Sequence, residues 1–148
     1  MRTLLLAALL AAPAFAENES KAVLAPVQAV MDGLAAHDAE RIKAAFTPDG
    51  RVVLVAGDKV VFNVTADEFA QRVTTNKEAE VLERLRNPQV QIRGRIAAVW
   101  SEYDFLRSGK LSHCGIDAFL LLKGDDGAWK ILSIESTVER EGCPATTQ

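Results

Sequence analysis

Two acidic residues in the last third of the chain, Asp117 and Glu135, have the type and spacing needed for proton transfer. They lie in two largely apolar runs, 111–123 and 129–139, which the sequence Gly-Asp-Asp-Gly separates, and this pattern predicts a β-hairpin. If the turn centres on Asp126, Asp117 stands opposite Glu135 with Cβ atoms about 5 Å apart. Two carboxylates that close cannot both ionise cheaply, so one pKa should rise towards neutrality, as a general acid or base requires. We therefore name both residues as candidate catalytic groups.

Two other arrangements of these acids remain open from the sequence. One acid could pair with an arginine on a neighbouring strand, such as Arg93 or Arg95, which would keep it ionised. Alternatively, a one-residue shift in the hairpin register would set Asp117 against Ser136 and separate it from Glu135.

The face of the hairpin that carries Asp117 combines apolar and polar side chains, as the wall of a ligand pocket does. On this face His113 is either a proton shuttle or a hydrogen-bonded wall residue. A separation of four residues along a strand spans about 13 Å, so His113 and Asp117 cannot share one metal ion, and neither a metal site nor a cofactor is predicted. The proposed pocket residues are Trp100, His113, Phe119 and Trp129, with Tyr103 as a candidate catalytic hydrogen-bond donor.

The opposite face of the same hairpin is also apolar near the turn, which predicts that both faces are covered. It carries residues such as Ile116, Ala118 and Leu120, together with Leu132 and Ile134 on the second strand. The helices can cover only one face, so we expect a second copy of the chain to cover this one and form a homodimer.

The chain has two cysteines, Cys114 and Cys143. A bridge between them would close a loop of about 30 residues and contribute about 3–4 kcal/mol on the chain-entropy model. The alternative is two separate thiols, one buried and one in a loose tail.

The N-terminus has the pattern of a cleavable secretory signal. Arg2 precedes an apolar run over 4–12, and the small residues Ala14 and Ala16 flank Phe15 before a polar stretch. A membrane-spanning helix needs about 20 apolar residues, and this run is shorter, so no membrane span is expected. We predict a signal peptide over 1–16, one domain over 17–142 and a loose tail over 143–148, in a periplasmic or secreted protein.

Charge argues against a nucleic-acid partner. The chain has 17 basic and 20 acidic residues, a net charge of −3, and the two signs are interspersed. Such a surface does not attract phosphate backbones.

Helical patterns precede a region of strands, which predicts an α+β fold with N-terminal helices packed on one face of a curved antiparallel sheet. Asp38 is expected to cap the second helix, and Thr65 with Glu68 forms a capping box for the third. The expected helices are 19–36, 39–46 and 65–73, and the expected strands are 51–55, 59–64, 81–86, 90–106, 111–123 and 129–139.

Seven short motifs carry a resemblance to a known family. They are Ala98-Val-Trp100, Tyr103-Asp-Phe105, Gly109-Lys110, Ser112-His-Cys-Gly115, Asp117-Ala-Phe119, Trp129-Lys-Ile131 and Glu141-Gly-Cys143. With these motifs and the order of its elements, the chain resembles the putative lumazine-binding branch of the nuclear transport factor 2-like superfamily, whose members form a cone of helices and bent sheet. The resemblance implies a ligand pocket inside the cone and dimerisation more than it implies a function, because the superfamily includes ketosteroid isomerase, scytalone dehydratase, polyketide cyclases and members without catalysis.

Three functions follow as hypotheses. The first is an exported domain that binds a small apolar or aromatic ligand without catalysis. The second is an isomerase, dehydratase or cyclase that acts on a hydrophobic carbonyl compound, with Asp117 or Glu135 as the base and Tyr103 as the donor. The third is a structural or protein-interaction module whose cone is filled by its own side chains.

Overall fold

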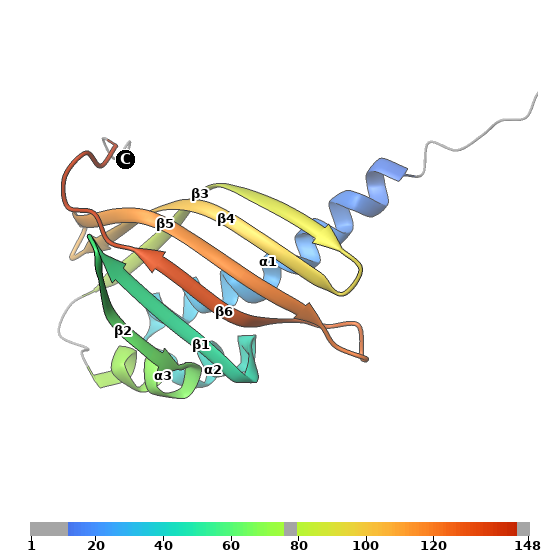
Figure 1. The fold of residues 1–148 in the computed structure, drawn as a ribbon. Helices are drawn as coiled ribbons and strands as arrows, with labels where there is room; N and C mark the ends of the chain where they lie inside the picture. Colours follow the sequence, from blue (N-terminus) through green and yellow to red (C-terminus); the bar gives the residue numbers. More distant parts are fainter. Residues whose placement is uncertain (1–11, 76–79, 145–148) are drawn as a thin grey trace, which may run out of the picture.

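The computed structural model describes residues 12–75 and 80–144, and the described residues form three helices and six strands (Figure 1). The helices precede or interrupt the first strands, and the second half of the chain is almost entirely sheet, as the sequence predicts. The elements are α1 (Ala12–Ala36), α2 (Ala39–Ala45), β1 (Phe46–Ala56), β2 (Lys59–Thr65), α3 (Ala66–Thr75), β3 (Val81–Arg93), β4 (Ile96–Arg107), β5 (Lys110–Lys123) and β6 (Trp129–Thr137).

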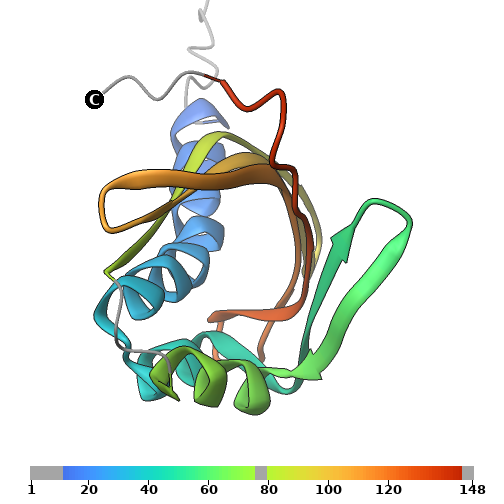
Figure 2. The ribbon, with the colours of Figure 1, turned by 90° about the vertical axis from the view of Figure 1, so that its left-hand side faces the viewer.

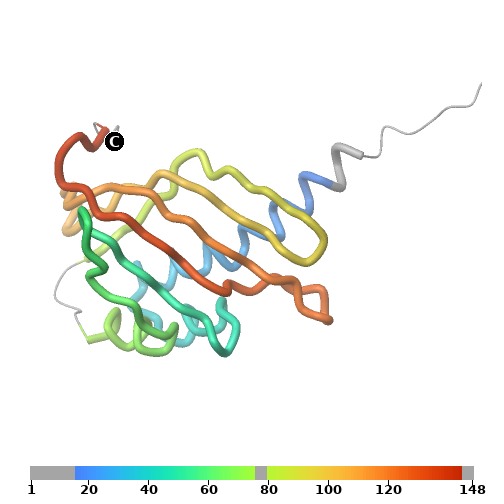
Figure 3. Tube along the Cα trace, in the orientation of Figure 1, coloured from blue at the N-terminus to red at the C-terminus, as the bar shows by residue number. Residues whose placement is uncertain are grey.

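The strands form one strongly bent sheet in the order β2-β1-β6-β5-β4-β3. Only β1 and β6 pair in parallel, and every other neighbouring pair of these six strands is antiparallel. The helices lie on the concave side of the sheet, with α1 crossing it and α2 and α3 closing one end (Figure 2). The course of α1 behind the strands can also be followed in the tube drawing (Figure 3).

The predicted helix caps are present. The Asp38 side chain accepts a hydrogen bond from the Arg41 backbone N–H at 3.0 Å. The Thr65 hydroxyl accepts from the Glu68 N–H at 3.2 Å, and the Glu68 carboxylate accepts from the Thr65 N–H at 2.8 Å. Pro26 lies inside α1, which begins earlier than predicted.

The predicted break at Asn87-Pro88 is wrong, because β3 continues through it. The two residues form an irregularity between Arg86 and Gln89, where Asn87 adopts a left-handed φ of 49°. The chain instead turns at Gly94, whose φ is 59°. The single strand expected over 90–106 is therefore the end of β3 and most of β4.

The core lies between α1, α2 and the concave face of the sheet. Apolar residues spaced by three and four on α1 pack against alternate residues of the central strands. The largest fully buried apolar side chains are Val23, Val27, Val30, Ile42, Val99, Phe119, Leu121 and Ile131.

Of the two alternatives for the cysteines, the structure contains the bridge. Cys114 on β5 and Cys143 are joined, with Cα atoms 5.7 Å apart. The bridge ties the start of the expected loose tail to the sheet, whereas 145–148 lie outside the described residues. Most of the expected signal peptide also lies outside them. No helix in the described part of the chain is long and apolar enough to cross a membrane.

Candidate functional site

The predicted pairing of Asp117 with Glu135 is wrong, because the final hairpin contains a bulge. Next to the turn the predicted register holds, with Leu121 opposite Ile131. The register then shifts by one residue, so that Leu120 faces Ser133 and Asp117 faces Ser136. This is the shifted alternative considered above, and it turns Glu135 to the outer, exposed face of the sheet.

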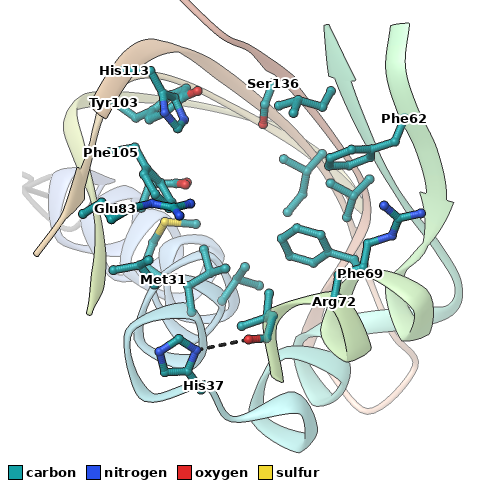
Figure 4. A pocket seen from close by; sticks show the side chains of 18 residues that line it. Met31, His37, Phe62, Phe69, Arg72, Glu83, Tyr103, Phe105, His113 and Ser136 are labelled. Carbon is teal, nitrogen blue, oxygen red and sulfur yellow. Dashed lines mark hydrogen bonds between the residues drawn. The ribbon is translucent and has the colours of Figure 1, made fainter. Parts of the chain in front are cut away.

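A cavity of about 330 Å³ lies inside the cone, between the concave face of the sheet and helices α1 and α3 (Figure 4). Its wall is mostly aliphatic and aromatic, and polar side chains are spread around it. The lining residues are Val30, Met31, Leu34, His37, Val52, Leu54, Phe62, Phe69, Arg72, Val73, Val81, Glu83, Tyr103, Phe105, Arg107, His113, Ile134 and Ser136.

Two of the predicted site residues, Tyr103 and His113, line this cavity. They project into it from β4 and β5, on the side opposite Phe62 and Arg72 (Figure 4). Asp117 is buried just behind the wall, with 1% of its surface exposed.

The other predicted pocket residues lie elsewhere. Trp100 points outwards with 57% of its surface exposed, because β4 alternates regularly and has no bulge between residues 100 and 103. Phe119 and Trp129 belong to the core and do not line the cavity. The Trp129 indole N–H donates to the Glu19 carboxylate at 3.2 Å, which fixes α1 against the end of the hairpin.

Asp117 is buried, and only one of its two carboxylate oxygens has a hydrogen-bond partner among the described residues. One oxygen accepts a hydrogen bond from the Ser136 hydroxyl at 2.6 Å. The other, Oδ2, is buried and has no hydrogen-bond partner among the described residues. Burial raises the pKa of Asp117 to about 6, and the hydrogen bond from Ser136 and the nearby Glu83 carboxyl oppose the rise.

The acid that interacts with Asp117 is Glu83 on β3, which lines the cavity. Its carboxyl reaches towards Asp117 without completing a hydrogen bond of ordinary geometry. Burial, and then the charge of Asp117, hold the pKa of Glu83 well above its usual value. The two carboxyls therefore form a pair in which one proton is retained more readily than in water.

The hydroxyl of Tyr103 is already engaged. It donates to the backbone carbonyl of Thr137 at 2.6 Å, and a carbonyl can only accept. Burial raises the pKa of Tyr103, so the phenol keeps its proton. Tyr103 can accept a hydrogen bond from a ligand, but it cannot donate to a ligand carbonyl while this contact persists.

His113 forms part of an aromatic cluster in the wall. Its ring stacks on the Phe105 ring with centroids 4.6 Å apart, and it packs edge to face with the Tyr103 ring with centroids 5.8 Å apart. Burial lowers the pKa of His113, and the charges of Arg140 and Arg107 lower it further. The imidazole is therefore neutral at pH 7. No group of three or more potential metal ligands occurs within residues 12–75 and 80–144.

Sequence reasoning missed Glu83 and the apolar wall opposite it. Glu83 shares its phase on β3 with Val81 and Leu85, and this alternation was the signal that it points inwards. The rings of Phe62 on β2 and Phe69 on α3 lie next to each other, with centroids 6.5 Å apart. Only the bend of the sheet brings these two side chains to the cavity.

Solved structures place this architecture in the nuclear transport factor 2-like class with a cystatin-like fold. A nuclear transport factor 2-like protein from Novosphingobium aromaticivorans has 16% identity and a TM-score of 0.70, and the match covers 92% of this chain and 91% of that one. A protein of unknown function from Mycobacterium tuberculosis has 15% identity and a TM-score of 0.75, covering 88% and 77%. A putative dehydratase from Streptomyces avermitilis has 19% identity and a TM-score of 0.66, covering 84% and 98%.

Within this class, the chain belongs to the family described as "Putative lumazine-binding", which it matches over residues 18–134. The family resemblance drawn from the sequence motifs is thereby confirmed. No curated protein matches the chain.

Proposed function

We propose that this protein is an exported binding protein for a small, largely apolar molecule, which it holds in the cavity inside the cone. The observation that carries the proposal is an open space of about 330 Å³ whose wall is mainly apolar and carries a few polar groups. Small-molecule sites have this character and begin at about 300 Å³. A cone filled by its own side chains, as a purely structural module requires, would have no such space. The family description points in the same direction.

Binding in the cavity can be tested with the uncharged dye N-phenyl-1-naphthylamine, whose fluorescence rises in apolar surroundings. Leu54 on β1 lines the cavity, so Leu54→Trp places an indole in it and is expected to weaken dye binding at least tenfold. The matched control is Val60→Trp, because Val60 on β2 is 62% exposed and lies outside the cavity. Equal dye affinity in wild type and Leu54→Trp would exclude the cavity as the binding site.

Export is supported by the N-terminal signal pattern and by the disulfide, which suits an oxidising compartment. The domain proposed over 17–142 agrees with the contacts of α1, since Glu19 accepts from Lys123 at 2.6 Å. Native mass spectrometry of protein purified from its host would report removal of residues 1–16, the number of subunits and any retained molecule.

The proposed homodimer would form through the outer face of the sheet, but the prediction that Ile134 belongs to this face is wrong, because the bulge turns Ile134 into the core with 3% of its surface exposed. Apolar side chains gather there on β4 and β5, with Trp100 57%, Ile96 44% and Leu120 39% exposed. Trp100→Lys places a charge at this face and should convert dimer to monomer in light scattering, without changing the circular dichroism spectrum. A wild-type monomer at micromolar concentration would refute the dimer.

Isomerase, dehydratase or cyclase activity on a hydrophobic carbonyl compound is a second candidate, favoured by the Asp117–Glu83 pair beside the cavity. One structural neighbour is a putative dehydratase, and another, from Erwinia carotovora atroseptica, is ketosteroid isomerase-like, with 21% identity, a TM-score of 0.60 and coverage of 85% and 98%. In this version Asp117 is the base, and Glu135, on the outer face, takes no part. Because the Tyr103 proton is engaged by Thr137, protonated Glu83 is the better hydrogen-bond donor to a carbonyl.

A further inference from the structure

The acids Glu83 and Asp117 have no positively charged partner in the part of the chain that the structure describes. Neither forms an ion pair within residues 12–75 and 80–144. Asp104, which is also buried, pairs with both Arg84 and Arg86. Asp117 is 1% exposed, and its Oδ2 atom has no hydrogen-bond partner among the described residues. Buried carboxylates are normally paired or fully hydrogen-bonded, so this pair can take a positive group that the described residues do not supply.

The pair is accessible from the cavity at two points, Glu83 and Ser136. Both residues line the cavity, and both interact with Asp117 behind the wall. The Ser136 hydroxyl donates to Asp117 at 2.6 Å, and the Glu83 carboxyl reaches towards the same acid. A ligand group bound between Glu83 and Ser136 therefore lies close to the charge of Asp117.

The hydroxyl groups on this side of the cavity offer acceptors to a ligand. The Ser136 proton is used by Asp117, and the Tyr103 proton is used by the backbone carbonyl of Thr137. Each hydroxyl has one proton, so towards the cavity both oxygens can only accept. A protonated primary amine has three N–H donors and no acceptor, which is the complement of such a wall.

The two arginines of the cavity wall do not take the place of this positive group. Arg72 and Arg107 are both exposed, so water weakens the effect of their charges inside the cavity. The Arg72 guanidinium lies 5.5 Å from the ring centroid of Phe62, on the side of the cavity opposite Glu83 (Figure 4).

The other titratable side chains of the described wall are Tyr103, His113 and His37. Burial raises the pKa of Tyr103, which keeps its proton, and burial is the main cause that lowers the pKa of His113. His37 bonds to the Val73 carbonyl at 3.1 Å and lies far from Ser136 in the wall (Figure 4). At pH 7.5 the charge beside Ser136 is therefore that of the acid pair.

We propose that the molecule bound in the cavity is a hydrophobic amine, with its ammonium group between Glu83 and Ser136 and its apolar body against Phe62 and Phe69. This inference rests on the proposed binding function and names the class of its ligand. Hydrogen bonds between an ammonium and a carboxyl group are about twice as strong as neutral ones. Asp117 acts from behind the wall as a positioning residue, because its charge attracts the ammonium without contact.

The test compares decylamine with 1-decanol, which have the same chain and differ in charge, as competitors of N-phenyl-1-naphthylamine at pH 7.5. In wild type we expect decylamine to bind at least tenfold more tightly than decanol. Glu83→Gln should reduce this preference to about threefold or less. The preference is a ratio measured within one variant, so a general change in the cavity does not affect it.

The pH dependence tests the part that Asp117 plays. Burial raises the pKa of Asp117 to about 6, so this acid is protonated at pH 5 and ionised at pH 7.5. The preference of wild type for decylamine should therefore rise about tenfold between these pH values. In Asp117→Asn the preference should stay low at both. A purely structural role of Asp117 would leave the rise in place, as would protonation of His113.

Glu135→Gln is the matched control, because it makes the same substitution as Glu83→Gln at an exposed position on the outer face of the sheet. If it lowered the preference as much as Glu83→Gln, the effect would be one of overall charge and the inference would be wrong. Equal binding of amine and alcohol to wild type would also overturn it, while leaving the proposed function intact. The proposed function itself fails separately, if the dye binds equally to wild type and Leu54→Trp.

Discussion

Gly115→Ala is expected to destabilise the protein by about 3 kcal/mol, which corresponds to a fall in Tm of about 10 °C for a domain of this size. A Cβ atom on residue 115 would lie 2.1 Å from the carbonyl oxygen of Thr137 and 2.9 Å from its carbonyl carbon. That carbonyl is not able to move cheaply, since it accepts the Tyr103 hydroxyl at 2.6 Å. The Thr137 hydroxyl in turn accepts from the Ile116 N–H at 3.0 Å. Urea unfolding at constant pH measures the loss.

Gly57→Ala separates this clash from the general cost of replacing a glycine. Gly57 has a φ of 59°, and a Cβ atom added to it would meet no other atom within 4 Å. Alanine at this position therefore meets only backbone strain of about 1 kcal/mol.

Tyr103→Phe provides a second check, because it removes the hydrogen bond from Tyr103 to the Thr137 carbonyl. This substitution should lower the free energy of unfolding less in the Gly115→Ala background than in wild type, because Thr137 is already displaced there. A loss below about 1 kcal/mol for Gly115→Ala would show that the close contact with Thr137 is not rigid.

Asp117→Asn is expected to stabilise the protein at pH 7.5 by about 3 kcal/mol and to leave its stability nearly unchanged at pH 4. Burial raises the pKa of Asp117 from its usual 3.8 to about 6. The folded state therefore holds the proton more tightly than the unfolded chain, and folding stability falls as the pH rises from about 4 through 6. Asparagine carries no charge at any of these pH values and retains an oxygen to accept the Ser136 hydroxyl, so the penalty disappears.

Asp104→Asn is the control for this prediction. Asp104 is also buried, at 2% exposure, but it forms ion pairs with Arg84 at 3.3 Å and Arg86 at 3.2 Å. Its replacement should lower stability at pH 7.5, the opposite sign to Asp117→Asn. Chemical unfolding of wild type and both variants between pH 4 and 8 measures these differences in the free energy of unfolding. An Asp117→Asn protein that is less stable than wild type at pH 7.5 would show that a favourable contact compensates the buried carboxylate.

If Asp117→Asn is more stable, the buried acid is a feature that folding alone would not favour. Proteins keep such costly groups where a site needs a proton near neutral pH. The same variant then separates the two proposed functions. Unchanged dye binding with lost turnover of the retained molecule would support catalysis, whereas retained turnover would remove Asp117 from it.

The sequence by itself determined the helix caps and the α+β class. Capping by Asp38 and by Thr65 with Glu68 acts over three residues, and the side-chain alternation that defines strands acts over two, so both are readable locally. The bridge between Cys114 and Cys143 remained one of two alternatives, because it depends on whether the tail returns to β5.

The tertiary structure decided the register of the last hairpin and, with it, the site. A bulge lies between the pair Leu121–Ile131 and the pair Leu120–Ser133, and it moves every later residue of β6 by one position. Because side chains along a strand alternate between the two faces, Glu135 leaves the inner face and Ser136 enters it. Glu83 interacts with Asp117 across β4 only because the sheet bends. Local pattern specifies which face a residue can take, but packing against the helices selects the bulge and the curvature that bring distant residues together.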